Sequence, residues 1–282
     1  MTGRSIGVVT IAAGRRRHLA RQIDSIAHQL HRPDAYVVVD MGGPPIEPNA
    51  LDRPRVVAAT GSGAQLDLAR SRNLGCHEVG TDVIVFLDAD CIATPTLVGD
   101  YAARLAERPG IHAGPVGYLP PRSDDDAWDV DSLDAVADYH ERRPHPATPL
   151  HRSDRYDLFW SLSFAIDRLS WDRIGGFDER YVGYGGEDTD FARTAQTSGI
   201  DLWFGGSAVA FHQFHPSSSP PTQHLDSICR NATVYYDKWG EWPMGGWLQA
   251  FVDLGLIAWR PSANAITVVG SAPHTARDAE LR

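Results

Sequence analysis

The sequence predicts an α/β fold in which a mostly parallel sheet is flanked by helices and followed by a helical C-terminal extension. Two observations favour this class. Short apolar runs alternate with longer segments, such as 15–30, whose apolar residues recur at helical spacing. The run 83–87 is apolar throughout, which is typical of a strand that helices bury on both faces.

The expected elements follow from this periodicity and from glycine and proline at their ends. The N-terminal half is expected to contain strands at 6–11, 36–39, 55–59 and 83–87, with helices at 15–30, 64–79 and 95–107. Pro95 suits the first turn of the last of these helices. The C-terminal half is expected to contain strands at 159–166, 202–204 and 208–211, with helices at 187–198, 224–238 and 246–257. Beyond about Pro261 there is no firm pattern.

The chain is expected to form one catalytic domain with an appendage. Residues 1–216 carry the alternating strands and helices, and residues 217–282 read as the helical extension. The segment 123–149 interrupts the alternation, because it is rich in Asp, His and Pro. We expect it to be a mobile or partly helical insertion.

The composition excludes some functions. The formal net charge of -10 argues against a nucleic-acid partner, which would require clustered basic residues. Three cysteines without metal-site spacing favour a reducing compartment. The sequence shows no signal-peptide pattern and no run of about 20 apolar residues. We therefore expect a cytoplasmic protein without a transmembrane segment, and peripheral contact with a membrane stays open.

An acidic pair follows the buried run 83–87. Asp88 and Asp90 are separated by one alanine, so a strand delivers two carboxylates to the edge where open α/β sheets bind ligands. Hard divalent cations prefer such oxygen ligands, and a cation with open positions can hold a nucleoside diphosphate. On its own the pair is equally consistent with a solvated turn.

A second acidic segment follows two glycines. Gly185 and Gly186 let the backbone approach a ligand closely, and Glu187 and Asp188 come next in the first turn of the expected helix. Acidic residues there also simply complement the helix dipole. The adjoining glycines favour a general base with access to a sugar hydroxyl, and Tyr184 offers an aromatic surface for the sugar.

Two histidines leave the expected strand 208–211. His212 and His215 could supply nitrogen ligands to the cation held by Asp90, and mixed carboxylate and imidazole ligands favour Mn²⁺ over Mg²⁺, with zinc still conceivable. Among Arg15, Arg16 and Arg17, one arginine aimed at a diphosphate is reasonable, whereas the others suit a solvated helix start.

These residues, in this order, resemble family 2 glycosyltransferases of the GT-A fold. The matching features are the strand end at Thr10, Asp40, the run Ala69 to Asn73, the Asp88 and Asp90 pair, the segment Gly185 to Asp188, and the two histidines. The C-terminal half, through Gly183 to Asp188, resembles β-1,4-galactosyltransferases and chondroitin-polymerase-type enzymes. The resemblance covers roughly residues 5 to 216.

The resemblance implies a role for each matching residue. Asp188 would be the catalytic base, with Glu187 binding the acceptor or the donor sugar. Residues implied in nucleotide binding are Thr10, Arg15, Asp40, Arg70, Arg72, Asn73 and Asp88. Residues implied in sugar or acceptor binding are Trp160, Tyr184, Gly185 and Gly186. Asp90, His215 and His212 would hold Mn²⁺ or Mg²⁺. Because Phe159 and Trp160 replace a Gly-Gly pair of the galactosyltransferases, galactose is not implied.

The expected function is therefore metal-dependent, inverting transfer of a sugar from a nucleotide sugar, with a UDP-sugar as the expected donor, to an acceptor hydroxyl. The acceptor would be a glycan, a glycolipid or a small molecule. Two alternatives remain at this point. A sugar nucleotidyltransferase would use the same fold, although no Gly-rich triphosphate loop follows the first strand. A non-catalytic carbohydrate-binding protein would use aromatics such as Trp239, Trp242 and Trp247.

Overall fold

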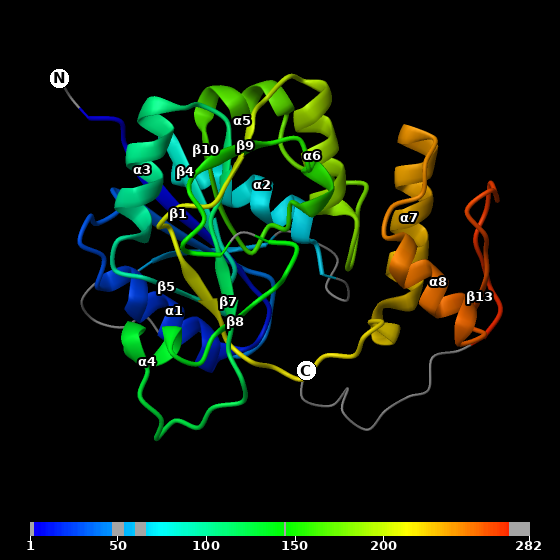
Figure 1. The fold of residues 1–282 in the computed structure, drawn as a ribbon, viewed down its shortest axis with the longest axis horizontal. Helices are drawn as coiled ribbons and strands as arrows, with labels where there is room; N and C mark the ends of the chain where they lie inside the picture. The colour runs from blue at the N-terminus through cyan, green and yellow to red at the C-terminus, as the bar shows by residue number, and fades with distance from the viewer. Residues whose placement is uncertain (1–2, 47–53, 60–65, 144, 271–282) are drawn as a thin grey trace.

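The computed structural model describes residues 3–46, 54–59, 66–143 and 145–270. Within these ranges the main element is an eight-stranded sheet with the order β3-β2-β1-β4-β10-β6-β11-β9 (Figure 1). Its strands are β1 (Ile6–Ala12), β2 (Ala35–Asp40), β3 (Arg55–Ala58), β4 (Val83–Leu87), β6 (Ile111–Ala113), β9 (His151–Ser153), β10 (Ser163–Asp167) and β11 (Leu202–Phe204). Strands β1 to β4 run parallel, β6 is parallel to β11, and β9 and β10 run antiparallel to their neighbours. The predicted mixed α/β fold with a mostly parallel sheet is confirmed.

Helices cover both faces of this sheet. On one face, α1 (Arg16–Ala27) and α3 (Leu97–Glu107) pack against alternate side chains of β1 and β4. On the other face, α2 (Leu68–Val79), α5 (Arg168–Ile174) and α6 (Glu187–Thr197) pack against the intervening ones. Every residue of β4 is buried, and the ring of Phe86 stacks 4.7 Å from that of Phe164. The apolar run of β4 is thus explained by cover on both faces.

A second, smaller sheet was not foreseen. In the described part of the chain it has four strands, in the order β5-β12-β7-β8. They are β5 (Cys91–Ala93), β12 (Ala210–His212), β7 (Val116–Tyr118) and β8 (Asp138–Tyr139). The antiparallel register of β12 and β5 sets His212 opposite Cys91, directly beside Asp90. This sheet therefore brings the distant C-terminal histidines to the acidic turn after β4.

The segment 123–149 is partly helical, as expected, and contains α4 (Val130–Asp134) together with β8. Several boundaries differ from the predictions. Pro95 precedes the N-cap Thr96 of α3 instead of lying in its first turn. The strand expected from residue 159 begins only at Ser163, because the 3₁₀ helix η1 (Tyr156–Leu158) comes just before it. Ile257 lies in a strand and not in the last helix. Of the helix expected at 64–79, residues 64 and 65 lie outside the described residues.

The C-terminal region contains two helices and a hairpin beside the α/β body (Figure 1). After the 3₁₀ helix η2 (Thr222–His224) come α7 (Leu225–Trp239), α8 (Gly245–Asp253), β13 (Ile257–Ala258) and β14 (Thr267–Val268). Leu225, Ile228, Leu248 and Phe251 form the buried core between the two helices. Among the helices that the structure describes, none combines the length and apolar character needed to cross a membrane.

Candidate functional site

The acidic pair lies in the turn between β4 and β5. The amide of Asp88 donates to the carbonyl oxygen of Leu162, just before β10, and the amide of Cys91 closes the turn by donating to the carbonyl oxygen of Asp88. Asp90 is 7% exposed and Asp88 is more open to solvent. The sheet edge formed by the ends of β1, β2 and β4 therefore presents both carboxylates, as predicted from the sequence.

Asp90 meets both histidines. The Nε2 atoms of His212 and His215 lie 3.6 Å and 3.5 Å from Asp90 Oδ2, and one ligand atom from each residue lies within 4.8 Å of the others. Two donors bound to one ion at about 2.1 Å each are separated by about 3 to 3.6 Å, so these three groups fit a shared cation. The donor set, one carboxylate and two imidazoles, suits Mn²⁺ or zinc better than Mg²⁺.

The protonation of these groups favours the same arrangement. Burial alone would raise the pKa of Asp90, but nearby positive charge, including the Arg15 guanidinium, holds it below the usual value. Burial lowers the pKa of both His212 and His215 below the usual histidine value. An ionised carboxylate beside two neutral imidazoles is the state that binds a metal ion.

Arg15 is the arginine of the basic run that reaches this cluster. It forms the N-cap of α1 in the left-handed conformation, with φ of 47°, and its Nη1 lies 2.5 Å from Asp90 Oδ2. Its Nη2 lies 3.4 Å from Nδ1 of His215. The guanidinium thus places positive charge at the same carboxylate oxygen that faces both imidazoles.

Arg72 joins the acidic turn to the second acidic segment. From α2, its two terminal nitrogens contact Asp88 at 3.3 Å and Glu187 at 3.2 Å, and its side chain is 4% exposed. Positive charge on Arg72 opposes the effect of burial on Asp88, and the net result still raises the pKa of Asp88 to about 7. The buried guanidinium therefore fixes the distance between the turn after β4 and the first turn of α6.

Asp188 stands next to this link and lacks a cationic partner. In the described residues no ion pair reaches its carboxylate, which accepts a hydrogen bond from the amide of Thr189 at 2.7 Å. Burial, followed by the negative charge of Glu187, raises the pKa of Asp188 to about 7. Gly186, with φ of 92°, caps α6 in a conformation that favours glycine, so the predicted glycine requirement has a backbone reason. A half-buried carboxylate with this pKa can exchange a proton near neutral pH.

Side chains of helix α7 bind the backbone of the segment just before Glu187 and Asp188. Asn231 donates to the carbonyl oxygen of Gly185 at 2.8 Å, and the side chain of Arg230 donates to that of Val182. Ser227 Oγ accepts from the amide of Tyr184 at 3.3 Å. The C-terminal region therefore contacts the backbone just ahead of Asp188.

Helix α7 also contacts α6 through an ion pair to a buried carboxylate. Lys238, the chain's one lysine, lies 2.8 Å from Asp190, which is 1% exposed and also accepts hydrogen bonds from Trp239 and Tyr181. Lys238 contacts Asp178 at 3.3 Å as well. This cluster fixes α7 to the turn of α6 that carries Asp188.

Replacing Lys238 with methionine is expected to destabilise the fold by about 3 kcal/mol, because it leaves the carboxylate of Asp190 buried without a counter-charge. For a chain of this size the melting temperature should fall by about 6 to 12 °C. Differential scanning calorimetry measures the change. Lys238→Arg, which keeps the charge, should recover most of the loss; equal melting temperatures for Lys238→Met and the unmodified protein would contradict this role.

Several residues implied in nucleotide binding do not reach the cluster. Thr10 is fully buried and accepts a hydrogen bond from Gln22, so its hydroxyl does not face a ligand. The side-chain amide of Asn73 donates to the carbonyl oxygen of Phe177 and accepts a hydrogen bond from the backbone N–H of the same residue. Arg70 is exposed on α2, one position from a helix face that turns toward the site. Spacing along the chain does not reveal these orientations, because they depend on which face of β1 and of α2 packs against the rest of the protein.

Asp40 lies at the end of β2, as predicted, and is paired with Arg16. The Arg16 Nη2 atom lies 2.9 Å from Asp40 Oδ1, and its Nε donates to the carbonyl of Pro44. The sequence places Arg16 only in the basic run, and its position at the start of α1, directly after Arg15, is the available signal. Arg16 therefore links the end of β2 to the loop that follows it.

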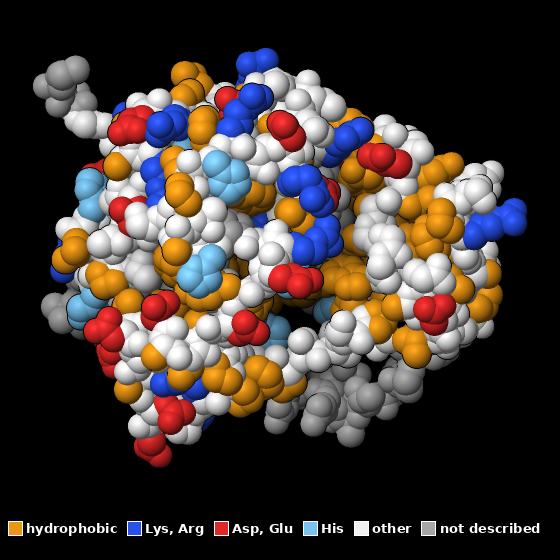
Figure 2. All heavy atoms as spheres, in the orientation of Figure 1, with side chains coloured by type: hydrophobic (Ala, Val, Ile, Leu, Met, Phe, Trp, Pro, Cys, Tyr) orange, Lys and Arg blue, Asp and Glu red, His pale blue; other side chains and the backbone are white. Residues whose placement is uncertain are grey.

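The aromatic residues predicted to bind sugar, Trp160 and Tyr184, lie in two separate groups of packed rings. Trp160 packs edge-on against His140, with ring centroids 5.0 Å apart. Tyr184 stacks on His224 at 4.5 Å and lies 6.0 Å from Trp247. The first group thus includes His140 of the insertion, and the second includes His224 and Trp247 of the C-terminal region. Figure 2 shows a hollow between the α/β body and these helices, with basic and acidic side chains on its rim.

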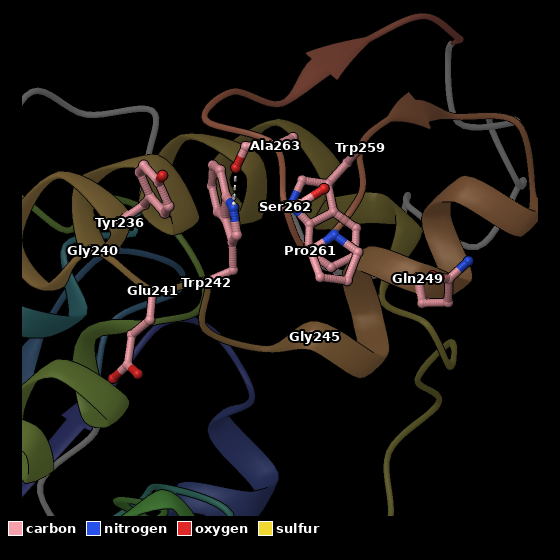
Figure 3. A pocket seen from close by; sticks show the side chains of 10 residues that line it. All are labelled: Tyr236, Gly240, Glu241, Trp242, Gly245, Gln249, Trp259, Pro261, Ser262 and Ala263. Atoms are coloured by element: carbon pink, nitrogen blue, oxygen red, sulfur yellow. Dashed lines mark hydrogen bonds between the residues drawn. The ribbon is translucent and has the colours of Figure 1, made fainter.

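A separate cavity of about 530 Å³ lies within the C-terminal region (Figure 3). The rings of Tyr236 and Trp242 stack at 4.3 Å, Trp259 crosses Trp242 edge-on, and the indole N–H of Trp242 donates to the carbonyl of Ala263. None of its lining residues belongs to the carboxylate and imidazole cluster. These tryptophans pack the extension, so the cavity is distinct from the candidate site.

Comparisons with known proteins agree with this geometry. The model of glycosyl transferase family 2 matches residues 7–166, and the model described as the N-terminal domain of galactosyltransferase matches residues 142–213. Validoxylamine A glucosyltransferase from Streptomyces hygroscopicus subsp. limoneus is 23% identical over 239 residues, which are 70% of this chain and 49% of that protein.

A solved structure shares the fold. The crystal structure of GalNAc-T7 with UDP, GalNAc and Mn²⁺ matches with a TM-score of 0.57 and 16% identity, over 84% of this chain and 51% of that one. This chain therefore spans about half the length of both relatives. The likeness confirms the predicted GT-A fold. Because the family 2 model matches more than half of its residues, the chain belongs to glycosyl transferase family 2.

Proposed function

We propose that this chain is a metal-dependent, inverting glycosyltransferase that moves a sugar from a nucleoside-diphosphate sugar, with UDP as the expected nucleotide, to an acceptor hydroxyl. The observation that carries the proposal is the bridge through Arg72. It joins Asp88, beside the Asp90 and histidine cluster, to Glu187, beside Asp188, which has no ion-pair partner among the described residues. Groups suited to a diphosphate and a group suited to a hydroxyl proton therefore occupy one site.

The proposed chemistry assigns the proton to Asp188. The acceptor oxygen bonds to the anomeric carbon while the bond from that carbon to the diphosphate oxygen breaks, and the hydroxyl proton passes to the Asp188 carboxylate. A double displacement would need a second free carboxylate as nucleophile. Glu187 and Asp88 are both held by Arg72, and Asp90 faces Arg15 and the histidines. This distribution of partners supports a single displacement and hence inversion.

Asp90, His212 and His215 would hold the cation, for which their separations and donor types are suitable. When bound, it would supply positive charge against the leaving nucleoside diphosphate. Arg15 is placed to contribute to the same end, because its guanidinium already lies at Asp90 and can pair with phosphate oxygens. Mn²⁺ is the proposed ion, since imidazole ligands suit it better than Mg²⁺.

The rest of the chain is proposed to shape the acceptor side. Residues 1–216 would form the catalytic domain. Residues 217–282 would act as an extension that holds the backbone of Gly185 through Asn231 and holds helix α6 through Lys238. Tyr184 with Trp247 offers a flat aromatic wall for a sugar of the acceptor, whether a glycan, a glycolipid or a small molecule.

The reaction rate is expected to rise with pH through about 7. Asp188 must be ionised to accept a proton, and its pKa is raised to about 7, so its active fraction grows about tenfold between pH 6 and pH 8. Burial lowers the pKa of His212 and of His215 below the usual histidine value, so these groups titrate at lower pH than Asp188. Initial rates from pH 5.5 to 9 at saturating Mn²⁺ test this. A flat profile would contradict the assignment of the base.

The function is tested by calorimetry with UDP and UDP-sugars, with and without Mn²⁺, followed by detection of free UDP during incubation with a UDP-sugar. Metal-dependent binding and slow release of UDP are the expected results. Pyrophosphate release from a nucleoside triphosphate would indicate nucleotidyl transfer instead, and binding without any turnover would indicate a carbohydrate-binding protein.

A further inference from the structure

Arg143, in the insertion 123–149, is a charged residue that the mechanism above leaves unused. Its guanidinium carbon lies 5.0 Å from the ring centre of Trp160 and 4.9 Å from that of Phe204. One terminal nitrogen, Nη1, donates to the carbonyl oxygen of Leu158. The other, Nη2, is shielded from solvent and has no hydrogen-bond partner within the described ranges. The head group is therefore held between two aromatic rings with one donor unsatisfied.

The charge of Arg143 is uncompensated as well. No carboxylate in the described part of the chain forms an ion pair with it, whereas its neighbour Arg142 is exposed and pairs with Asp157. Burial lowers the pKa of Arg143 to about 10. Taking a guanidinium out of water costs free energy unless an anion or several acceptors replace the water. Aromatic faces offset only part of this cost.

The position of Arg143 connects it to both halves of the proposed site. Arg143 follows β8, whose Asp138 pairs with Tyr118 of β7. The ring of Tyr118 in turn lies 5.3 Å from that of His212, one of the candidate metal ligands. Trp160, over which Arg143 sits, is the aromatic residue predicted to contact the sugar. The unsatisfied cation thus lies beside Trp160, the residue predicted to contact the sugar.

We propose that Arg143 binds an oxyanion of the substrate: a phosphate of the donor nucleotide or a carboxylate carried by the transferred sugar. This inference rests on the proposed function and deepens it, because it assigns the insertion a part in substrate selection. A planar guanidinium pairs with either anion through two parallel hydrogen bonds. The bound anion would satisfy Nη2 and neutralise the charge that the protein leaves unpaired.

The test compares Arg143→Gln with Arg142→Gln, a matched change one residue away on the exposed side. Calorimetry in Mn²⁺ gives the dissociation constants for UDP, UDP-glucose and UDP-glucuronate. We expect Arg143→Gln to weaken binding about 10- to 100-fold and Arg142→Gln to leave it unchanged. If the anion is a phosphate, all three ligands lose affinity. If it is a sugar carboxylate, only UDP-glucuronate does.

Arg143→Lys serves as the second variant, since it keeps the charge and the fold but lacks the paired donors. It should bind with an affinity between those of Arg143→Gln and the unmodified protein. Unchanged dissociation constants for every ligand in both variants would overturn the proposal and leave Arg143 as a packing residue on Trp160.

Failure of the proposed function itself gives a different result. If the unmodified protein binds no nucleotide, thermal shifts with inorganic pyrophosphate and with glucuronate still report on the anion site. A rise in melting temperature that Arg143→Gln removes and Arg142→Gln keeps would support the site on its own. The same absence of a shift in all three proteins would reject it.

Discussion

Replacing Asp188 with asparagine is expected to lower kcat about 1000-fold while the dissociation constant for UDP stays within about twofold of its original value. Asparagine keeps the size of the side chain and can still contact the amide of Thr189, but it cannot accept the acceptor proton. Because no cation pairs with Asp188 in the part of the chain described, its removal should disturb no ion pair. Steady-state rates and calorimetry on the same preparation measure both quantities.

The matched control is Asp226→Asn, which makes the same change at an exposed aspartate in the first turn of α7. It should leave kcat unchanged. Normal turnover by Asp188→Asn would remove the base from the mechanism. A parallel loss of UDP affinity would instead show that Asp188 acts by positioning the nucleotide site.

Replacing Asp90 with asparagine is expected to abolish the stabilisation that Mn²⁺ confers and to bring turnover to background. Asp90 Oδ2 faces both imidazoles, so the change removes the only charged ligand of the three residues in the cluster. At a concentration 100-fold above its dissociation constant, a metal stabilises the native state by about 2.7 kcal/mol. For a chain of this size this corresponds to about 5 to 11 °C in melting temperature.

Alanine at His215 should weaken Mn²⁺ binding by at least about tenfold, whereas alanine at His28, which is exposed at the C-cap of α1, should have no effect. Thermal shifts with a series of Mn²⁺ concentrations give these affinities. An unchanged shift in Asp90→Asn would show that the cation binds elsewhere. A stronger response to Zn²⁺ than to Mn²⁺ in catalytic assays would replace the proposed ion but keep the site.

Inner strands of the main sheet, two of its helices and the acidic motifs could be predicted from local pattern. Continuous apolar runs predicted β1, β2 and β4, and helical spacing predicted α1 and α6, because these elements bury one face or both against the sheet. The turn after β4 and the start of α6 follow from the ends of those elements. Short strands such as β5 and β7, of three residues each, carry too little pattern to be recognised alone.

The amino-acid sequence by itself determined the class of the fold, the two acidic segments and the histidine pair. Each of these is recognised from the order of residue types within a short stretch of the chain. Only the tertiary structure decided which of these side chains meet. Pairing of β12 with β5 sets His212 beside Asp90, and packing of α2 turns Arg72 inward and Arg70 outward. Contacts of this kind depend on strand register and helix rotation, which arise from burial across the whole chain and are not encoded in any single segment.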